Sequence, residues 1–511
     1  MSETAKLQFF GDISLESELG DCEQLIHSLD AELGIADLRI GNLECVLQEN
    51  EFVQPIKKIG AVRHADKSKL DFFKKLRIDV AVIANNHIGD CGESGVDSTI
   101  KALHESNITS LGAGKNIEKA YESIRYTFHG VTISLLAICE NEFGVATEEK
   151  YGVAGYNVSR VVKAVLREKE KADHVIIIFH GGNEYCPIPS VETRERYRFL
   201  IDMGASAIIG MHTHCPQGYE YYNDGLIVYS LGNFYFPMEG KAAYSTWYEG
   251  YVASLRCSKK NVDIDVIPYR YSPLKNVIVP LIGENRDIFD DYIKELNEII
   301  KCKKELQKLY FAWCLYGGKN YACCLDWKER YVLSDAREPR SLEIQNVFRC
   351  ESHRELLQNY FELVSNNKQN AYLEHWKKLK KIMHIPITIQ DIDEALMHIP
   401  HDITIKNINY IMDRTENREV YICGAGKVGV NLYKNLRKSE RTVRAFLDNN
   451  PELENNFLGD TRIESYDILR QNECNNCIFV IAIKNKSVQE EIRKQLRVGR
   501  IKDYQILNVE F

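Results

Sequence analysis

The chain has 511 residues, with 65 Lys and Arg against 73 Asp and Glu, which gives a formal net charge of −8. At roughly 150 residues per domain this length predicts about three domains. The 44% hydrophobic and 27% charged content is typical of a folded globular protein and excludes a disordered or collagen-like chain. The acidic balance also argues against a basic nucleic-acid coat protein, so no nucleic-acid partner is expected.

The first residues have neither the basic region nor the apolar stretch of a signal peptide. The longest apolar runs, such as residues 175–179, have the length of strands, so no transmembrane segment is expected. Fifteen cysteines without an export signal indicate a reducing compartment rather than a disulfide framework. We therefore expect a cytoplasmic protein.

From residue 6 to about residue 278, short β-branched runs alternate with helical stretches, which predicts an α/β domain over residues 1–280. Several of these runs are continuously apolar instead of alternating, so their strands should be buried on both faces. We expect a layered core that is covered by helices or by a second sheet.

Residues 281–417 change character, because apolar side chains recur there at three- and four-residue spacing, and this predicts a helical connector. The lysine-rich stretch at residues 377–381 is interpreted as a solvated helix face. Residues 418–511 return to strand, glycine turn, helix and strand, which opens a βαβ unit and predicts a small Rossmann-like α/β domain.

In the first domain, apolar strands repeatedly end in residue types that bind metals. Because the carboxyl ends of strands in an open α/β sheet meet at one edge, these side chains can converge from distant positions. Imidazole, carboxylate and amide oxygen form a ligand set for zinc, manganese or iron. The residues are Asp12, Glu44, Asn86, His87, His180, His212 and His214.

Each of these residues has an alternative structural explanation. Asp12 could cap a helix, Asn86 could hold a tight turn, and a single histidine near a strand end is commonly a hydrogen-bonded structural residue. The combination favours a metal site, because the His212-x-His214 pair would place both imidazoles on one side of an extended chain.

The same residues carry a family resemblance over residues 6 to 240. The motifs GD (11–12), GNLE (41–44), ANNHIGDCG (84–92), GAG (112–114), HGGNEY (180–185), GMHTH (210–214) and SLGNF (230–234) resemble the CapA-type family. That family is bacterial and is associated with capsule and poly-γ-glutamate biosynthesis. The resemblance implies a calcineurin-like metallophosphatase fold.

The resemblance also implies roles for the site residues. Asp12 and His214 would serve one divalent cation, Asn86, His180 and His212 would serve another, and Glu44 would bridge the two ions. The cations would activate water for attack on phosphorus and neutralise the charge that develops there. His87 would protonate or stabilise the leaving oxygen, with Asp90 orienting its ring.

The chain departs from the metallophosphatase pattern at its first motif. Where many metallophosphatases have Asp-x-His, this chain has Asp12-Ile13-Ser14, so one ion loses an imidazole ligand and its site would be weak or empty. The bridging carboxylate is Glu44 rather than an aspartate. Glu184, Tyr185 and Asn233 are secondary candidates near the site, each with an equally plausible structural role.

A glycine motif opens the last domain. Gly424, Gly426 and Gly429 form G-x-G-x-x-G between a strand and a helix, and Asp448 ends the next strand. This is the context of the dinucleotide-binding fingerprint, in which backbone N–H groups approach a phosphate and the acid binds ribose hydroxyls. The segment also resembles the small Rossmann-like domain of bacterial sugar acyltransferases, which implies a nucleotide or nucleotide-sugar ligand. A purely structural role for the glycines is the alternative.

We therefore expect a metal-dependent, phosphoesterase-like hydrolase of the CapA type that acts on an anionic small molecule or polymer, alongside other polymer-biosynthesis proteins. One alternative is a non-catalytic accessory or scaffold protein with a nucleotide-sugar sensing domain. Another is action on an amide or γ-glutamyl link.

Overall fold

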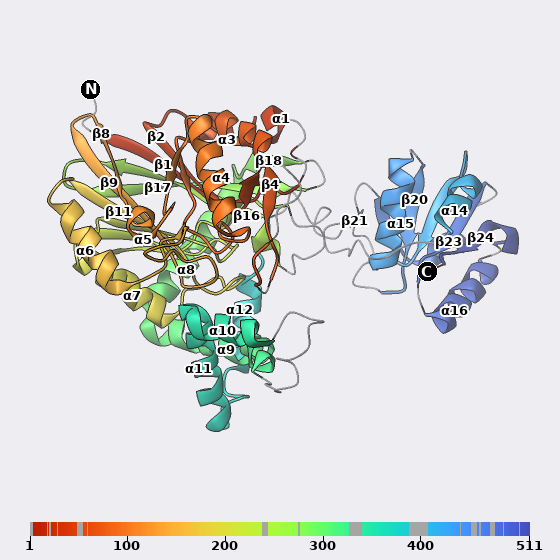
Figure 1. Cartoon of the computed structure of the whole chain (residues 1–511). Coiled ribbons are helices and arrows are strands. Elements are labelled where there is room, and N and C mark those ends of the chain that lie inside the picture. Colours follow the sequence, from red (N-terminus) through yellow and green to blue (C-terminus); the bar gives the residue numbers. More distant parts are fainter. Residues whose placement is uncertain are drawn as a thin grey trace. The chain divides into compact units, whose positions relative to one another are not determined.

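A computed structural model of the chain describes residues 4–17, 19, 22–27, 29–48, 55–58, 60–237, 244–273, 276–325, 340–387, 407–439, 441–450, 457–458, 461–470, 476–483, 485–499 and 501–510. These residues form two compact units, the first within residues 4–237 and 244–386 and the second within residues 387–510 (Figure 1). No helix in the described ranges combines the length and the apolar character that crossing a bilayer requires.

The first sheet of the larger unit has the strand order β18-β17-β16-β1-β2-β5-β6, with β15 paired to β1. Strands β1, β2, β5 and β6 run parallel, whereas β16, β17 and β18 are antiparallel to their neighbours. The strands are β1 (Ala5–Ile13), β2 (Leu38–Leu43), β5 (Val80–Val82), β6 (Thr109–Leu111), β15 (Asn233–Tyr235), β16 (Glu249–Cys257), β17 (Val262–Ser272) and β18 (Val277–Pro280).

The second sheet has the order β13-β14-β12-β11-β9-β8, with β9, β11, β12 and β14 parallel. Its strands are β8 (Ile124–Phe128), β9 (Val131–Cys139), β11 (His174–His180), β12 (Ala207–Met211), β13 (Tyr219–Tyr222) and β14 (Gly225–Val228). Strand β11 is buried along its whole length, as its continuous apolar run predicted.

The two sheets lie against each other, with β1 beside β12 and β14 beside β17. Helices α6 (Val158–Lys169) and α7 (Val191–Asp202) cover the outer face of the second sheet, where side chains such as Val161 and Leu200 pack on Ile177 and Ile208. Smaller elements complete the layers: α1 (Cys22–Ile26), α2 (Asp30–Leu33), β3 (Val46–Gln48), β4 (His64–Asp66), α3 (Asp71–Lys75), α4 (Gly92–Glu105), β7 (Ala113–Gly114), α5 (Ile117–Ala120) and β10 (Gly152–Val153).

The helical region that follows belongs to this same unit up to residue 386. It comprises α8 (Glu284–Lys301), α9 (Lys303–Cys324), α10 (Arg340–Arg349), α11 (Glu351–Ser365) and α12 (Leu373–Ile382). Helix α11 packs on α9, and its first residue, Glu351, accepts hydrogen bonds from the backbone N and the Nδ2 of Asn141, which follows β9. The helices therefore reach the loops at the carboxyl ends of the second sheet.

The second unit has a sheet of order β21-β22-β20-β19-β23-β24, parallel except for β21. One hydrophobic cluster contains α14 and α15, and another contains α16. The strand order reverses between β19 and β23, which is where ligands bind in doubly wound sheets. Its elements are α14 (Ile408–Arg414), β19 (Glu419–Cys423), α15 (Lys427–Lys438), β20 (Val443–Leu447), β21 (Phe457–Leu458), β22 (Thr461–Glu464), β23 (Cys477–Ile481), α16 (Lys486–Val498) and β24 (Ile506–Asn508). The predicted fold class, a layered α/β domain with helices and a small Rossmann-like domain, is confirmed.

Candidate metal centre

Asp12 lies at the end of β1, where the two sheets of the larger unit meet. Its side chain is fully buried. Its Oδ1 accepts a hydrogen bond of 2.8 Å from Nδ2 of Asn42 on the neighbouring strand β2, and its Oδ2 accepts one of 3.0 Å from the backbone N of His212 on the opposite sheet. The first predicted ligand therefore sits on the seam between the sheets, within reach of groups from both.

Glu44 follows β2 and occupies the middle of the cluster. Its Oε1 is 3.7 Å from Nε2 of His214 and 3.9 Å from Nε2 of His87. The carboxylate is fully buried, yet neither oxygen has a hydrogen-bond partner among the described residues. A buried carboxylate without a hydrogen bond is costly, and a cation between Glu44 and the imidazoles would satisfy it.

His180 and His212 approach each other from the ends of β11 and β12. Nδ1 of His212 is 3.0 Å from Nε2 of His180, and the same Nε2 is 3.0 Å from Oδ1 of Asn86. Nδ2 of Asn42 contacts the other ring nitrogen of His180 at 3.3 Å. Four polar groups, one from the end of each of four strands, thus converge, because the parallel strands of both sheets point their carboxyl ends the same way.

The backbone at the two histidines after β12 differs from the extended chain that the sequence suggested. His212 has φ 94° and His214 has φ 55°, a region that residues with a Cβ rarely adopt. With this backbone the two ring centroids are 6.0 Å apart, and His212 meets His180 while His214 faces Glu44. Such strain is characteristic of functional sites, and here it divides the His-x-His pair between two groups of ligands.

Two groups of possible metal-binding atoms result, and both include Glu44. Glu44, His180 and His212 form one group, and Asp12, Glu44 and His214 form the other, with the ligand atoms of each lying within 4.8 Å of one another. All five side chains are buried. Carboxylates and imidazoles suit zinc, manganese or iron, so the residues present fit a divalent metal.

The protonation of the cluster follows from its burial. Burial raises the pKa of Glu44 well above its ordinary value. Burial opposes protonation of His214, but the carboxylates of Glu44 and Asp12 raise its pKa to about 9. Burial lowers the pKa of His180. Without a cation, Glu44 and His214 therefore retain protons, and a bound metal would displace them.

His87, the expected proton-transfer residue, and Asp90, the residue expected to orient its ring, form a buried pair. Nδ1 of His87 is 2.8 Å from Oδ2 of Asp90, and Nε2 of His87 points toward Glu44. Burial lowers the pKa of His87 to about 4, against the raising effect of Asp90. The ring is therefore neutral near pH 7, and its Nε2 side faces the centre.

Three asparagines support the cluster, and sequence reasoning gave them little or no role. Asn42 contacts Asp12 and His180, as described above. Asn85 donates from Nδ2 to Oδ1 of Asn42 at 3.1 Å, and accepts from the backbone N of His87. Asn233, a secondary candidate, contacts Nδ1 of His214 with its Oδ1 at 2.8 Å. Asn42 and Asn85 stand inside the GNLE and ANNH motifs, so the motifs were a signal for both.

Glu184 and Tyr185 lie beside the centre on the loop after β11. Burial alone would raise the pKa of Glu184, but the nearby imidazoles, above all that of His214, lower it below its ordinary value. Tyr185 has φ 64° and stacks on Trp247 with ring centroids 5.5 Å apart. Trp247 also contacts the ring of His214 at 4.9 Å, so this aromatic pair borders the centre.

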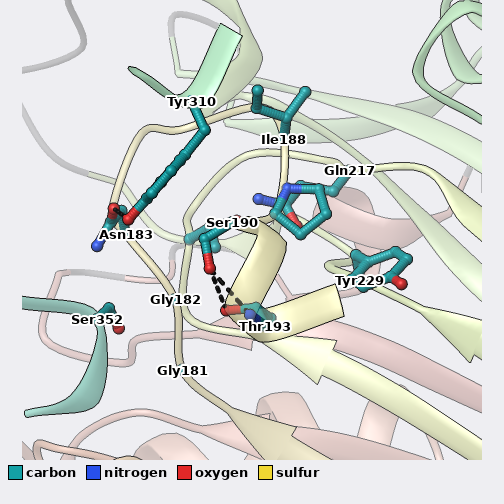
Figure 2. A pocket seen from close by; sticks show the side chains of 12 residues that line it. Gly181, Gly182, Asn183, Ile188, Ser190, Thr193, Gln217, Tyr229, Tyr310 and Ser352 are labelled. Carbon is teal, nitrogen blue, oxygen red and sulfur yellow. Dashed lines mark hydrogen bonds between the residues drawn. The ribbon is translucent and has the colours of Figure 1, made fainter. Parts of the chain in front are cut away.

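The helical region closes the loop after β11 from the other side. A cavity of about 10 Å³ lies there, which is room for about one water molecule. Figure 2 shows Tyr310 of α9 reaching Asn183, and the Tyr310 hydroxyl donates to Oδ1 of Asn183 at 3.0 Å. Ser190 donates to Glu355 of α11 at 2.6 Å. The helices are thus bonded to the loops that carry the site.

The glycine motif of the second unit forms a tight strand-to-helix turn. Gly424 has φ 107°, and a Cβ on Gly429 would lie 1.9 Å from the carbonyl oxygen of Gly424. By contrast, a Cβ on Gly426 would meet nothing within 4 Å. The backbone N of Ala425 donates to Oδ2 of Asp448 at 2.8 Å. The structure thus brings the four predicted residues together. Packing requires a glycine at position 429, whereas the space around Gly426 would admit a side chain.

Comparison with known proteins finds sequence relatives of the first unit. Residues 6–238 match the model of a family described as "Bacterial capsule synthesis protein PGA_cap". The chain is 32% identical over 169 residues to the capsule biosynthesis protein CapA of Bacillus anthracis, covering 32% of this chain and 41% of that protein. It is 29% identical over 238 residues to the PGA biosynthesis protein CapA of Bacillus subtilis (strain 168), covering 45% of this chain and 62% of that protein.

The chain therefore spans 41% and 62% of the lengths of these two relatives. A solved structure, a 5'-nucleotidase precursor from Thermus thermophilus, is similar at 11% identity with a TM-score of 0.32, over 54% of this chain and 55% of that one. Residues 6–238 are thus similar to the CapA-type capsule synthesis proteins that the motifs indicated.

Proposed function

We propose that the chain is a cytoplasmic, metal-dependent hydrolase of the phosphoesterase type that acts in the synthesis of capsule, poly-γ-glutamate or another cell-surface polymer. The observation that carries the hydrolase proposal is Glu44, a buried carboxylate without a hydrogen-bond partner among the described residues, which both groups of possible metal-binding atoms share. The similarity to the CapA-type family supports the biological setting.

Asp12, Glu44 and His214 would hold one divalent ion, and Glu44, Asn86, His180 and His212 would hold the other. Manganese, zinc and iron all fit this donor set. When bound, such ions supply Lewis acidity and a water molecule of lowered pKa. The protein holds the ligands rigidly through Asn42 and Asn233, which fixes their orientation before any substrate arrives.

His87 would handle the proton at the reacting oxygen. Its Nε2 faces the centre, while Asp90 holds Nδ1. A ring with this orientation can accept a proton at Nε2 and then pass it to the leaving oxygen of an anionic substrate. Asp90 contacts Nδ1, the ring nitrogen that does not face Glu44, and would act by orienting the ring.

The test is metal analysis joined to activity. The purified chain should bind manganese, zinc or iron and hydrolyse chromogenic phosphomonoesters or phosphodiesters. His180→Ala and His212→Ala should lose metal and activity together. His174→Gln is the matched control, because His174 lies at the opposite end of β11 and contacts the carbonyl oxygen of Ser258 at 2.5 Å. It should keep both.

Other outcomes would redirect the proposal. Metal binding without turnover of phosphoesters or γ-glutamyl substrates would leave a non-catalytic accessory or scaffold protein of polymer synthesis. Turnover of a γ-glutamyl amide but not of phosphoesters would assign amide chemistry. A chain that binds none of the three metals would overturn the hydrolase proposal.

For the second unit we propose a nucleotide or nucleotide-sugar ligand. Gly426 carries this proposal, because neither packing nor a positive φ requires glycine there, whereas a phosphate approaching the backbone would. Asp448 also lines a cavity of about 570 Å³ with Asn450, Tyr466 and Lys494. Calorimetric titration with ATP and with UDP-glucose should detect binding that Gly426→Val abolishes. Unchanged binding by the variant would contradict the proposal.

A further inference from the structure

Lys58 is a buried lysine beside the candidate centre, at a position with no motif in the sequence. Only 5% of its side chain is exposed, and its Nζ forms an ion pair with Oδ1 of Asp90, whose side chain is fully buried. The same Nζ lies 3.5 Å from Nδ1 of His87. Its neighbour Lys57 is exposed, so the burial is particular to Lys58.

Asp90 connects the lysine to the histidine. Its Oδ1 accepts from Lys58, and its Oδ2 contacts Nδ1 of His87 at 2.8 Å and accepts from the backbone N of Arg63 at 2.9 Å. The backbone carbonyl of Asp90 also accepts from the backbone N of Ile56 at 2.8 Å. The segment that carries Lys58 is therefore anchored on Asp90 from both sides.

The charges of this cluster determine where the imidazole proton lies. The ionised carboxylate of Asp90 can only accept, so Nδ1 of His87, 2.8 Å from its Oδ2, carries the proton. The Lys58 ammonium, which can only donate, gives its hydrogen bond to Oδ1 of Asp90. Because Lys58 balances the charge of the buried carboxylate, His87 is not needed as its counter-ion. The lone pair of Nε2 then points toward Glu44, 3.9 Å away.

We propose that Lys58 is a positioning residue of the site, which holds Asp90 in place so that His87 keeps its proton on Nδ1 and presents Nε2 to the centre. The catalytic consequence rests on the proposed hydrolase function. The effect on the histidine ring does not, because it is a property of the protein with or without substrate.

The first experiment determines by NMR which nitrogen of the His87 ring carries the proton. The full chain is labelled with ¹⁵N-histidine, and the His87 signals are identified at pH 7.5 as those that vanish in His87→Gln. The wild type and Lys57→Met should show one tautomer, protonated at Nδ1, and Lys58→Arg should retain it. Lys58→Met should lose this single-tautomer pattern. An unchanged His87 pattern in a folded Lys58→Met would overturn the proposal.

A second variant is used if Lys58→Met fails to fold. Lys58→Met combined with Asp90→Asn leaves no unbalanced buried charge, and it should fold while still losing the wild-type His87 pattern. A wild-type His87 pattern in this double variant would likewise overturn the proposal.

The second experiment measures turnover of whichever chromogenic phosphoester the wild type hydrolyses. Lys58→Met should lower kcat by about 10–100-fold, with KM and metal content close to wild type, and Lys58→Arg should recover part of the loss. A rise in KM alone would contradict a positioning role. If the wild type hydrolyses no phosphoester, the hydrolase proposal fails, and the NMR result still decides the role of Lys58.

Discussion

Oε1 of Glu44 lies 3.7 Å from Nε2 of His214, and both side chains are buried at the seam of the two sheets. Asn233 contacts the other nitrogen of the same ring. Nδ2 of Asn233 donates to two backbone carbonyls, so its Oδ1 is the atom that faces His214, and it accepts from Nδ1 of that ring. When the ring is neutral, its Nε2 is therefore unprotonated and points toward Glu44. This is the orientation that a metal ligand needs, and it leads to the first predictions.

Glu44→Gln should abolish stabilisation by metal without harming the metal-free protein. The substitution removes a buried carboxylate that has no hydrogen-bond partner in the described part of the chain, so the metal-free variant should be at least as stable as the wild type. Thermal unfolding with and without Mn²⁺ measures both effects, because a ligand that binds the native state raises Tm. Glu105→Gln, on an exposed helix face, is the control and should behave as wild type. A full metal-induced shift in Glu44→Gln would contradict the bridging role.

Metal binding should weaken as the pH falls. The carboxylates of Glu44 and Asp12 raise the pKa of His214 to about 9, so below that pH a proton competes with the cation for the ring. Displacing one proton changes the apparent affinity by about tenfold per pH unit. Calorimetric Mn²⁺ titrations between pH 6.5 and pH 8.5, in buffers of different ionisation enthalpy, should show affinity rising with pH and proton release on binding. A pH-independent affinity would exclude His214 as a ligand.

Asn233→Ala should weaken the binding of the ion held by His214 more than that of the ion held by His180 and His212. The change frees the ring of His214 from its 2.8 Å contact with Oδ1 of Asn233, and loss of such a supporting contact costs about 10–100-fold in metal affinity. Metal content after dialysis at limiting Mn²⁺ should fall toward that of His214→Ala. Ions held by His180 and His212 should stay, and an equal loss at both sites would indicate general disruption of the fold.

Glu355 should make the first unit less stable at alkaline pH. Burial raises the pKa of Glu355 to about 8, against the lowering effect of the Ser190 hydroxyl. Between the unfolded value near 4.5 and the folded value near 8, the unfolded state ionises first, so the free energy of unfolding falls as pH rises. The slope is roughly 1 kcal/mol per pH unit over that window.

Glu355→Gln removes this slope and should stabilise the protein at pH 8 relative to the wild type. Urea denaturation followed by tryptophan fluorescence at pH 5.5 and pH 8.5 measures the difference. The control is Glu362→Gln, an exposed position on the same helix α11, which should keep the wild-type slope. Equal slopes in wild type and Glu355→Gln would show that the carboxyl group is not held protonated.

The two glycines of the second unit should respond oppositely to alanine. Gly429→Ala places a Cβ 1.9 Å from the carbonyl oxygen of Gly424 and should destabilise the unit, by on the order of 1–3 kcal/mol as for other overpacked sites. Gly426→Ala meets nothing within 4 Å and should leave folding unchanged. Hydrogen exchange of β19 and β20 distinguishes the two. Strong destabilisation by Gly426→Ala would mean that this glycine serves the fold alone.

The amino-acid sequence by itself determined the local features of this protein. Continuous apolar runs such as residues 175–179 became buried strands, and polar residues directly after them, such as Asp12 and His180, lay at the strand ends. The glycine turn before α15 was equally predictable. These features depend on neighbours in the chain, since strand periodicity and turn chemistry are short-range properties.

The tertiary structure alone decided which of these residues meet. The division of His212 and His214 between two groups depends on backbone angles after β12, and on the approach of the two sheets. Lys58 and Glu355 reach their partners from segments that carry no motif, so no pattern in the sequence pointed to them. Their roles follow from burial and from charges that only the folded chain brings together, because electrostatic pairing depends on distance in space rather than along the chain.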